Sequence, residues 1–335
     1  MKRYLFYSII FLTTSLTAQN AVHSFNIWGQ GGYSNLFIRN SEVSNRGGFG
    51  GIIGLGYGYK KNHFISEVGL EFDYKSSLAK HGDFRMQVGK FIDENTGQEI
   101  PLGTPIISTM RPIVEGGFVH TEFNPENKFV MQYNFTDLQD LYKISYINLP
   151  LRAGGTFNGF YFLAGTKIGL NVLSYSKTSG KHTSTGYFPQ DIGYLSEMPQ
   201  HSFVKNKAGE DNTRFNGKLG LNLAASTEVG VNLMLPYLIL QELRLAVFAD
   251  YGVLNINSTN YNNDFVCVPA TDQVGLDPNI IKYNALLTSN IKPSVNPFVA
   301  GLKVTVLLTS QNNHHNEYSN RYTKWWVIGY KKRSR

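Results

Sequence analysis

Several features common in secreted and helical membrane proteins are scarce in this sequence. Cysteine is nearly absent: Cys267 is the only one among 335 residues, which excludes an internal disulfide framework and a lipid-anchored cysteine near the N-terminus. Charged residues make up only 16% of the chain. Past residue 18 no apolar run approaches the ~20 residues that a spanning helix needs, so the sequence predicts no transmembrane helix.

An excess of basic residues along the body of the chain is also lacking, although the formal net charge is +7. Lys2 and Arg3 lie at the N-terminus, and the rest of the surplus lies in residues 310–335. Between these ends acids and bases balance, so no basic face is available for a phosphate backbone. We therefore expect no nucleic-acid partner.

The N-terminus has the pattern of a Sec-type signal peptide. Two bases precede an apolar run from Tyr4 to Leu12, and "TTSLTAQN" follows. We expect cleavage after Ala18, with a retained N-terminal anchor as the alternative. The signal peptide would then cover residues 1–18.

Glycine and aromatic residues are abundant, with 33 Gly, 20 Tyr and 22 Phe. The stretch from Phe49 to Tyr59, "FGGIIGLGYGY", does not have the GxGxxG spacing of a nucleotide-binding loop. Gly48, Gly50, Gly54, Gly56 and Gly58 instead share one parity, and apolar or aromatic residues hold the other. Side chains alternate between faces along a strand, so this pattern predicts a strand with one bare face, which leaves room for neighbours such as Glu67 and Glu71.

The same period of two recurs in long runs. Every run exceeds the ~9 to 11 residues that a transmembrane strand needs. Short turns at "KKN", "FNG" and "MLPYLI" alternate with long loops, as in outer-membrane barrels. The sequence thus predicts an all-β, antiparallel transmembrane β-barrel over residues 19–309, with short periplasmic turns and long extracellular loops. We count eight runs, at 23–34, 47–60, 63–75, 142–157, 159–175, 215–232, 240–255 and 297–309.

The loop at 76–141 contains the strand-like pieces "GGFVHTEF" and "NKFVMQYNF". These pieces would either extend the barrel wall above the membrane or add a fifth hairpin, which would make a ten-stranded barrel. We prefer eight strands, with ten as the alternative.

The two faces of the runs predict different surroundings. The apolar parity would face lipid: Phe64, Val68, Leu70, Phe72, Leu243, Leu245, Val247, Leu302, Val304 and Val306. The other parity carries acids and bases in near balance: Glu67, Glu71, Asp73, Arg152, Lys167, Lys218, Glu228, Glu242, Arg244, Asp250 and Lys303. Charges inside a narrow lumen must be paired. This balance favours a plugged barrel over a small porin.

Candidate catalytic and metal-binding groups are scattered. His63 falls at a predicted turn, whereas His81, His120, His182 and His201 fall in predicted loops, with no serine at a recognisable spacing. His314 and His315 adjoin without a third ligand. We expect no cofactor and no enzymatic activity, with a lipid-modifying enzyme as the alternative.

A basic aromatic tail, expected in the periplasm, forms the third segment, residues 310–335. Its candidate contact residues are Trp325, Trp326, Lys331, Lys332 and Arg333. Aromatic and basic residues together favour a membrane interface or an acidic partner, and a disordered periplasmic extension is the alternative.

The stretch "YKISYINLPLRAGGTF" at residues 142–157 resembles the hallmark strand of the PorT-like outer-membrane β-barrel family of Bacteroidota. The matching residues are Tyr146, Ile147, Leu149, Pro150 and Leu151. The resemblance implies an eight-stranded barrel in the outer membrane of a Gram-negative bacterium, without catalytic residues, and some relatives assist type IX protein secretion. Because proline lacks a ladder donor, we expect a bulge or bend at Pro150.

Together these patterns predict a non-enzymatic integral outer-membrane barrel, structural or partner-binding through its loops or tail. Its expected partners are outer-membrane lipid and a periplasmic or secretion-machinery protein. An accessory role in protein secretion, a small porin and a lipid-modifying enzyme remain the alternatives.

Overall fold

The computed structural model describes residues 21–88, 119–120, 128–188, 193–196, 204–234, 242–257, 260–267 and 281–309. These residues are mostly in strands, and among them no helix has the length and apolar character to cross a membrane. The predicted signal peptide, the "MLPYLI" turn and the basic aromatic tail lie outside the described residues, almost or entirely.

Eight long strands close into a ring, which confirms the predicted all-β antiparallel barrel. Each strand pairs antiparallel with the next, β14 pairs with β1, and β6 pairs with β7, so the ring has no free edge. The ten-stranded alternative is wrong, because the other described strands pair with β6, with β7 or with each other, outside the ring. The ring strands are β1 (Ala21–Arg39), β2 (Val43–Lys61), β3 (Phe64–His81), β6 (Lys128–Phe157), β7 (Phe160–Phe188), β10 (Asn222–Met234), β11 (Glu242–Gly252) and β14 (Ser294–Thr309).

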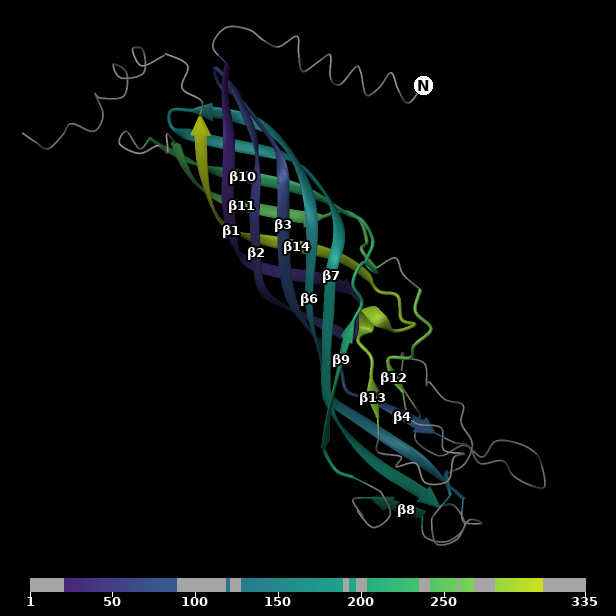
Figure 1. Ribbon diagram of the computed structural model, residues 1–335. Helices are drawn as coiled ribbons and strands as arrows, with labels where there is room; N and C mark the ends of the chain where they lie inside the picture. The colour runs from purple at the N-terminus through teal and green to yellow at the C-terminus, as the bar shows by residue number, and fades with distance from the viewer. Residues whose placement is uncertain are drawn as a thin grey trace, which may run out of the picture.

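Tight turns lie at one end of the ring. Asn62 joins β2 to β3 with a φ of 53°, and Asn158 and Gly159 join β6 to β7 with φ of 50° and 86°. Asparagine and glycine tolerate this left-handed backbone, so both "KKN" and "FNG" form the turns that the sequence predicts. The beginning of β1 and the end of β14 lie at this same end, which we call the turn end (Figure 1).

The opposite, loop end carries a two-stranded extension of the wall. β6 and β7 run to 30 and 29 residues, far beyond the ring (Figure 1). The predicted loop 76–141, and the loop predicted between the runs 159–175 and 215–232, are therefore too long: "KFVMQYNF" belongs to β6, and β7 continues to Phe188. Four short strands pair with these two: β4 (Phe84–Val88), β5 (Val119–His120), β8 (Gly193–Ser196) and β9 (Lys207–Arg214).

The extension has an ordinary apolar core. We define the loop-side extension as residues 128–144 of β6 and 174–188 of β7 with β4, β9, β12 (Val266–Cys267), β13 (Lys282–Tyr283) and the 3-10 helix η2 (Leu286–Thr288). Phe135, Tyr142 and Leu286 are fully buried in its core, which continues into the loop end of the ring through Leu36 and Val295. Apolar packing therefore holds the wall together past the ring.

Candidate functional site in the barrel interior

The ring has apolar side chains outside and polar ones inside. Leu302 and Ile53 on the outer face are 67% and 66% exposed, whereas Lys167 on the inner face is 1% exposed. All ten residues predicted to face outward are exposed or half-buried. Strand alternation thus carries charged side chains into the lumen, as the sequence pattern indicates.

Arg152 lies at the centre of the interior network. Its Nη1 donates to Glu67 Oε1 at 2.9 Å and to Glu228 Oε2 at 3.3 Å, and its Nη2 pairs with Glu71. Both β3 carboxylates thus meet one guanidinium from β6 and a third carboxylate from β10 across the lumen. The planar guanidinium of Arg152 carries a fork of N–H donors, which suits such multiple contacts.

Two lysines extend the network around the ring. Lys303 Nζ from β14 donates to Glu228 Oε2 at 2.7 Å and lies 3.4 Å from Glu67 Oε1. Lys167 Nζ from β7 lies 2.7 Å from both Glu71 Oε2 and Asp250 Oδ2. The ion pairs thereby connect five strands besides β6, so the side chains bridge the lumen rather than only lining it.

Other members extend this network toward the two ends. Towards the loop end Asp73 pairs with Lys75 and accepts a hydrogen bond from Asn148 Nδ2 at 3.0 Å. At the turn end Arg244 Nε donates to Glu242 Oε1 at 3.2 Å.

Lys218 is a correction to the predicted network. It is exposed and precedes β10, because the strand predicted from residue 215 begins only at Asn222. Lys75 takes a place inside instead, and it has the same parity as Glu67, Glu71 and Asp73. Within the ring, five buried acids thus face five buried bases among the described residues: Glu67, Glu71, Asp73, Glu228 and Asp250 against Lys75, Arg152, Lys167, Arg244 and Lys303.

Trp28 of β1 is a member that the sequence reasoning missed. Its indole Nε1 donates to Glu71 Oε1 at 2.9 Å, and Lys303 Nζ lies 4.9 Å from its ring centroid. The indole fills the space beside the glycines of β2: a Cβ on Gly54 would overlap it, and one on Gly56 would lie 2.9 Å from Cη2. The glycines make room for Trp28 rather than mainly for Glu67 and Glu71. The alternation along β1 indicates that Trp28 faces inward, but only the pairing of β1 with β2 places it opposite Gly54.

Two further polar side chains donate hydrogen bonds to carboxylates of the network. Tyr161 donates its hydroxyl to Glu228 Oε1 at 2.5 Å, and Asn26 Nδ2 donates to Glu67 Oε2 at 3.0 Å. Removing charges from water is costly unless pairing and hydrogen bonds replace the lost hydration. Here ion pairs and hydrogen bonds engage most of the buried charged groups, within a lumen whose described acids and bases balance, so the arrangement can seal the barrel.

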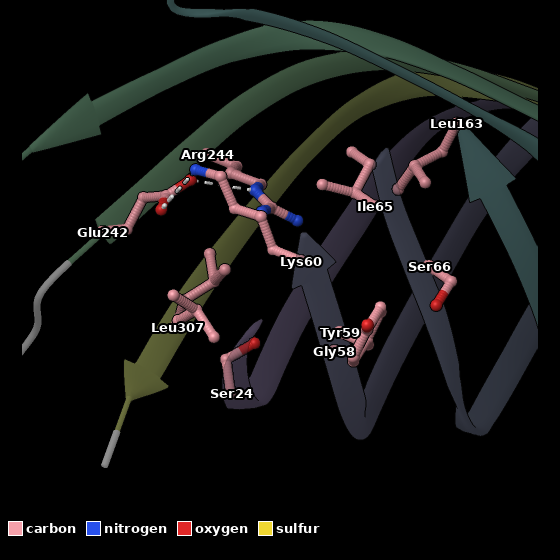
Figure 2. A pocket seen from close by; sticks show the side chains of 11 residues that line it. Ser24, Gly58, Tyr59, Lys60, Ile65, Ser66, Leu163, Glu242, Arg244 and Leu307 are labelled. Carbon is pink, nitrogen blue, oxygen red and sulfur yellow. Dashed lines mark hydrogen bonds and ion pairs between the residues drawn. The ribbon is translucent and has the colours of Figure 1, made fainter. Parts of the chain in front are cut away.

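A small pocket lies at the turn end of the barrel. Its volume is about 20 Å³, room for about one water molecule. Figure 2 shows Arg244 and Glu242 bonded to each other on one side, with Ser24 and Tyr59 among the other side chains around it. The pocket is lined by Val22, Ser24, Gly58, Tyr59, Lys60, Ile65, Ser66, Leu163, Glu242, Arg244 and Leu307.

A buried carboxylate anchors η2 to the wall at the loop end. Asp140 Oδ2 accepts from Tyr142 at 2.7 Å and from the Leu286 backbone N–H at 2.9 Å, and it lies 3.0 Å from His81 Nε2. Its Oδ1 accepts from Thr178 at 2.6 Å. The segment that follows β13 is therefore held against β6 by one fully buried acid.

The histidines whose side chains the structure describes do not converge on one site. His81 lies beside Asp140, and His182 Nδ1 lies 3.0 Å from the Tyr283 hydroxyl. Burial, aided by Asp211, raises the pKa of Tyr283 to about 12, which keeps that hydroxyl protonated. His63 lies at the turn end, near the Thr156 carbonyl. Among the described residues no group of three or more His, Cys, Asp or Glu is placed to hold a metal ion. His201, His314 and His315 lie outside the described residues, and the side chain of His120 is not described.

The strand that carries the family resemblance contributes to both faces. Tyr146 and Pro150 point inward and are buried, whereas Ile147, Leu149 and Leu151 are 48%, 40% and 43% exposed. The bulge predicted at Pro150 is misplaced: the register with β7 shifts between Ser145 and Tyr146, and the pairing of β3 with β6 has the same register on both sides of Pro150.

Comparisons with known proteins leave the family open. No family model and no curated protein matches the chain. Ail, the attachment invasion locus protein of Yersinia pestis, solved in complex with the heparin analogue sucrose octasulfate, is 10% identical with a TM-score of 0.27, over 86% of this chain and 99% of that chain. Neisserial surface protein A is 9% identical with a TM-score of 0.25, over 84% of this chain and 96% of that chain. At these scores the architecture rests on the strand pairing of this chain alone, and the PorT-like resemblance stays a prediction.

Proposed function

We propose that this chain is a non-enzymatic integral outer-membrane β-barrel with a sealed interior, whose loop-side extension presents a surface to a partner. The observation that carries the proposal is the inverted polarity of the ring, apolar outside and ionic inside. In water such a surface would be costly, whereas in lipid it is favourable.

Aromatic residues at both ends of the ring support the proposal that the apolar outer surface between them lies in a membrane. At the loop end Phe37 packs 5.8 Å from Phe298 and 6.5 Å from Tyr251, and at the turn end Tyr59 packs 6.5 Å from Phe64. Such belts at both interfaces are typical of outer-membrane barrels. Between them the outward residues are mainly apolar or small.

The height of this band also fits a bilayer. On β3 the outward residues from Phe64 to Tyr74 include no charge. Ten residue steps of about 3.3 Å give about 33 Å along the strand, which at a tilt of about 40° is about 25 Å of height. That value equals the usual apolar band of bacterial barrels.

Two measurements test the proposal on the full chain. Membrane-extracted protein should float with vesicles and migrate faster on a gel before boiling than after it, because a closed barrel stays compact in detergent. Recovery in the soluble periplasmic fraction would contradict membrane insertion. Planar-bilayer recording, with a known porin as positive control, should then show no steady conductance. Steady conductance would favour the porin alternative while leaving the insertion intact.

The contact of the tail with a secretion-machinery protein stays a prediction. Residues 310–335 lie outside the described residues, so only the sequence pattern supports it. The sealed interior supports a structural or binding role over a permeation pathway, because the charges that would select an ion are already paired with one another.

A further inference from the structure

A pair of basic side chains lies on the outer face of the wall, at the loop-end border of the apolar band. Outward positions on β7 run from Leu170 through Leu173 to Tyr175. Tyr175 is paired with Lys143 on β6 and with Arg214 on β9, and both basic residues are exposed. Lys143, Tyr175 and Arg214, which we call the border triad, therefore form one row across three adjacent strands.

The two cations of the border triad have no carboxylate partner among the described residues. Lys143 Nζ lies 5.9 Å from the ring centroid of Tyr175, whose hydroxyl is bonded to Asn212. This contact positions the ammonium beside the aromatic ring without neutralising it. The border triad thus carries two positive charges that nothing in the described structure compensates.

The acids nearby on the same face are already engaged. Facing outward on β3, β6, β7 and β9, the described residues include two acids, Asp137 and Glu210. Lys181 Nζ lies 3.0 Å from Asp137, and Lys177 Nζ lies 2.7 Å from Glu210. Neither acid therefore offsets the border triad, whose nearest neighbours on the ring side are the apolar residues of the band.

We propose that the border triad binds the phosphate group of an anionic membrane lipid in the leaflet on the loop side. Cations at the edge of an apolar band meet lipid headgroups, and an aromatic residue between them occupies the interfacial depth. Arginine and lysine together suit a phosphate, the first as a fork of donors and the second as a point charge. The lipid chains would lie along Leu170, Leu173 and Ile147, which are exposed on the band below.

This inference rests on the proposed membrane insertion, so its test begins with the flotation assay. Full-length protein is reconstituted in phosphatidylcholine nanodiscs that contain a minor fraction of lipid A as the phosphorylated probe. Native mass spectrometry then counts the lipid A molecules that remain on the released protein. A chain that fails to float contradicts the proposed function, whereas a floating chain that retains no lipid A contradicts only the inference.

Charge-removing variants distinguish a specific lipid site at the border triad from a general effect of positive surface charge. Lys143→Gln with Arg214→Gln should lower lipid A retention by more than about tenfold, because each basic residue near the membrane surface contributes a several-fold gain in affinity. The matched control is Lys80→Gln with Lys181→Gln, which removes the same charge from the same face farther from the band, and it should retain lipid A as the wild type does. Equal retention in all three proteins, or equal loss in both variants, would overturn the proposal.

Two further measurements test the remaining explanations: binding of free phosphate at the border triad, and misfolding of the double variant. Inorganic phosphate should fail to displace lipid A, since the apolar chains contribute to binding; displacement would assign the border triad to free phosphate and overturn the lipid site. If the double variant does not form the heat-modifiable barrel, Arg214→Gln alone, at the exposed end of β9, should still lower retention. Unchanged retention in a folded Arg214→Gln protein would contradict the role of Arg214.

Discussion

The same two strands, β6 and β7, build two regions with opposite interiors. Within the ring Lys167 is buried at 1% exposure and Leu170 is 66% exposed, whereas in the loop-side extension Phe135 is fully buried and the Lys181 side chain is 49% exposed. The backbone alternation is the same in both regions. The surroundings of the outer face therefore decide which parity is apolar: lipid around the ring, by our proposal, and water around the extension.

The change of polarity falls close to a β-bulge. The register between β6 and β7 shifts at Ser145 and Tyr146, so β7 carries one extra residue there. On the ring side the inward residues include Asn148 and Arg152, and on the other side they include Ile144 and Tyr142. A bulge increases the local twist, which lets a two-stranded ribbon leave a closed ring. The extension is thus a continuation of the wall with a new core rather than a separate domain.

Arg152→Met gives the largest expected effect and tests whether the ring interior is dry. It should lower the free energy of unfolding by about 3 to 5 kcal/mol, because three buried carboxylates lose their shared cation. Urea titration read by gel mobility of the folded form measures this. The control Lys177→Met breaks the solvent-exposed pair with Glu210 and should lower the free energy of unfolding far less than Arg152→Met does. A similar small cost for both variants would mean that water screens the ring interior.

Gly54→Val tests the packing of the ring against Trp28. We expect a loss of about 2 to 3 kcal/mol and slower appearance of the folded form, because the new side chain occupies the space of the indole. Gly29→Val is the matched control: a Cβ on Gly29 has nothing within 4 Å, so this change should be close to neutral. Equal behaviour of the two variants would show that strand glycines act through the backbone rather than through room for Trp28.

Asp140→Asn should have the smallest effect, and one confined to the loop-side extension. Replacing the carboxylate weakens its bonds to Tyr142, Thr178 and the Leu286 N–H, at a cost of about 1 to 2 kcal/mol. Limited proteolysis should then cut residues 281–291 faster, while heat-modifiable mobility stays unchanged. Asp137→Asn, at an exposed acid bonded to Lys181, is the control and should leave cleavage as in the wild type. Loss of the barrel form with Asp140→Asn would show that the two regions fold as one unit.

The sequence predicted the ring well because its signal is local. Period-two alternation identified all eight ring strands, and "KKN" and "FNG" marked two turns by residues that accept a left-handed backbone. The ends of the strands were less predictable. Alternation in residues 128–141 is interrupted near the bulge at Thr136 and Gln139, so this part of β6 resembled a loop.

The network was predictable in its membership but not in its partners. Parity selected most of the inward charges, and it failed at Lys218, where alternating residues precede the strand. The sequence does not show which carboxylates contact Arg152, or that Trp28 donates to Glu71. These contacts depend on the stagger of neighbouring strands around the ring.

The sequence by itself determined that this chain forms long strands with one apolar and one polar face, since side-chain direction follows from residue parity alone. Only the tertiary structure decided that the polar faces close on one another as five acids and five bases, with Trp28 in the space left by the glycines of β2. It also decided that β6 and β7 leave the ring to build a second core. The physical reason is that pairing across a closed ring depends on register and stagger, which join residues far apart in the chain.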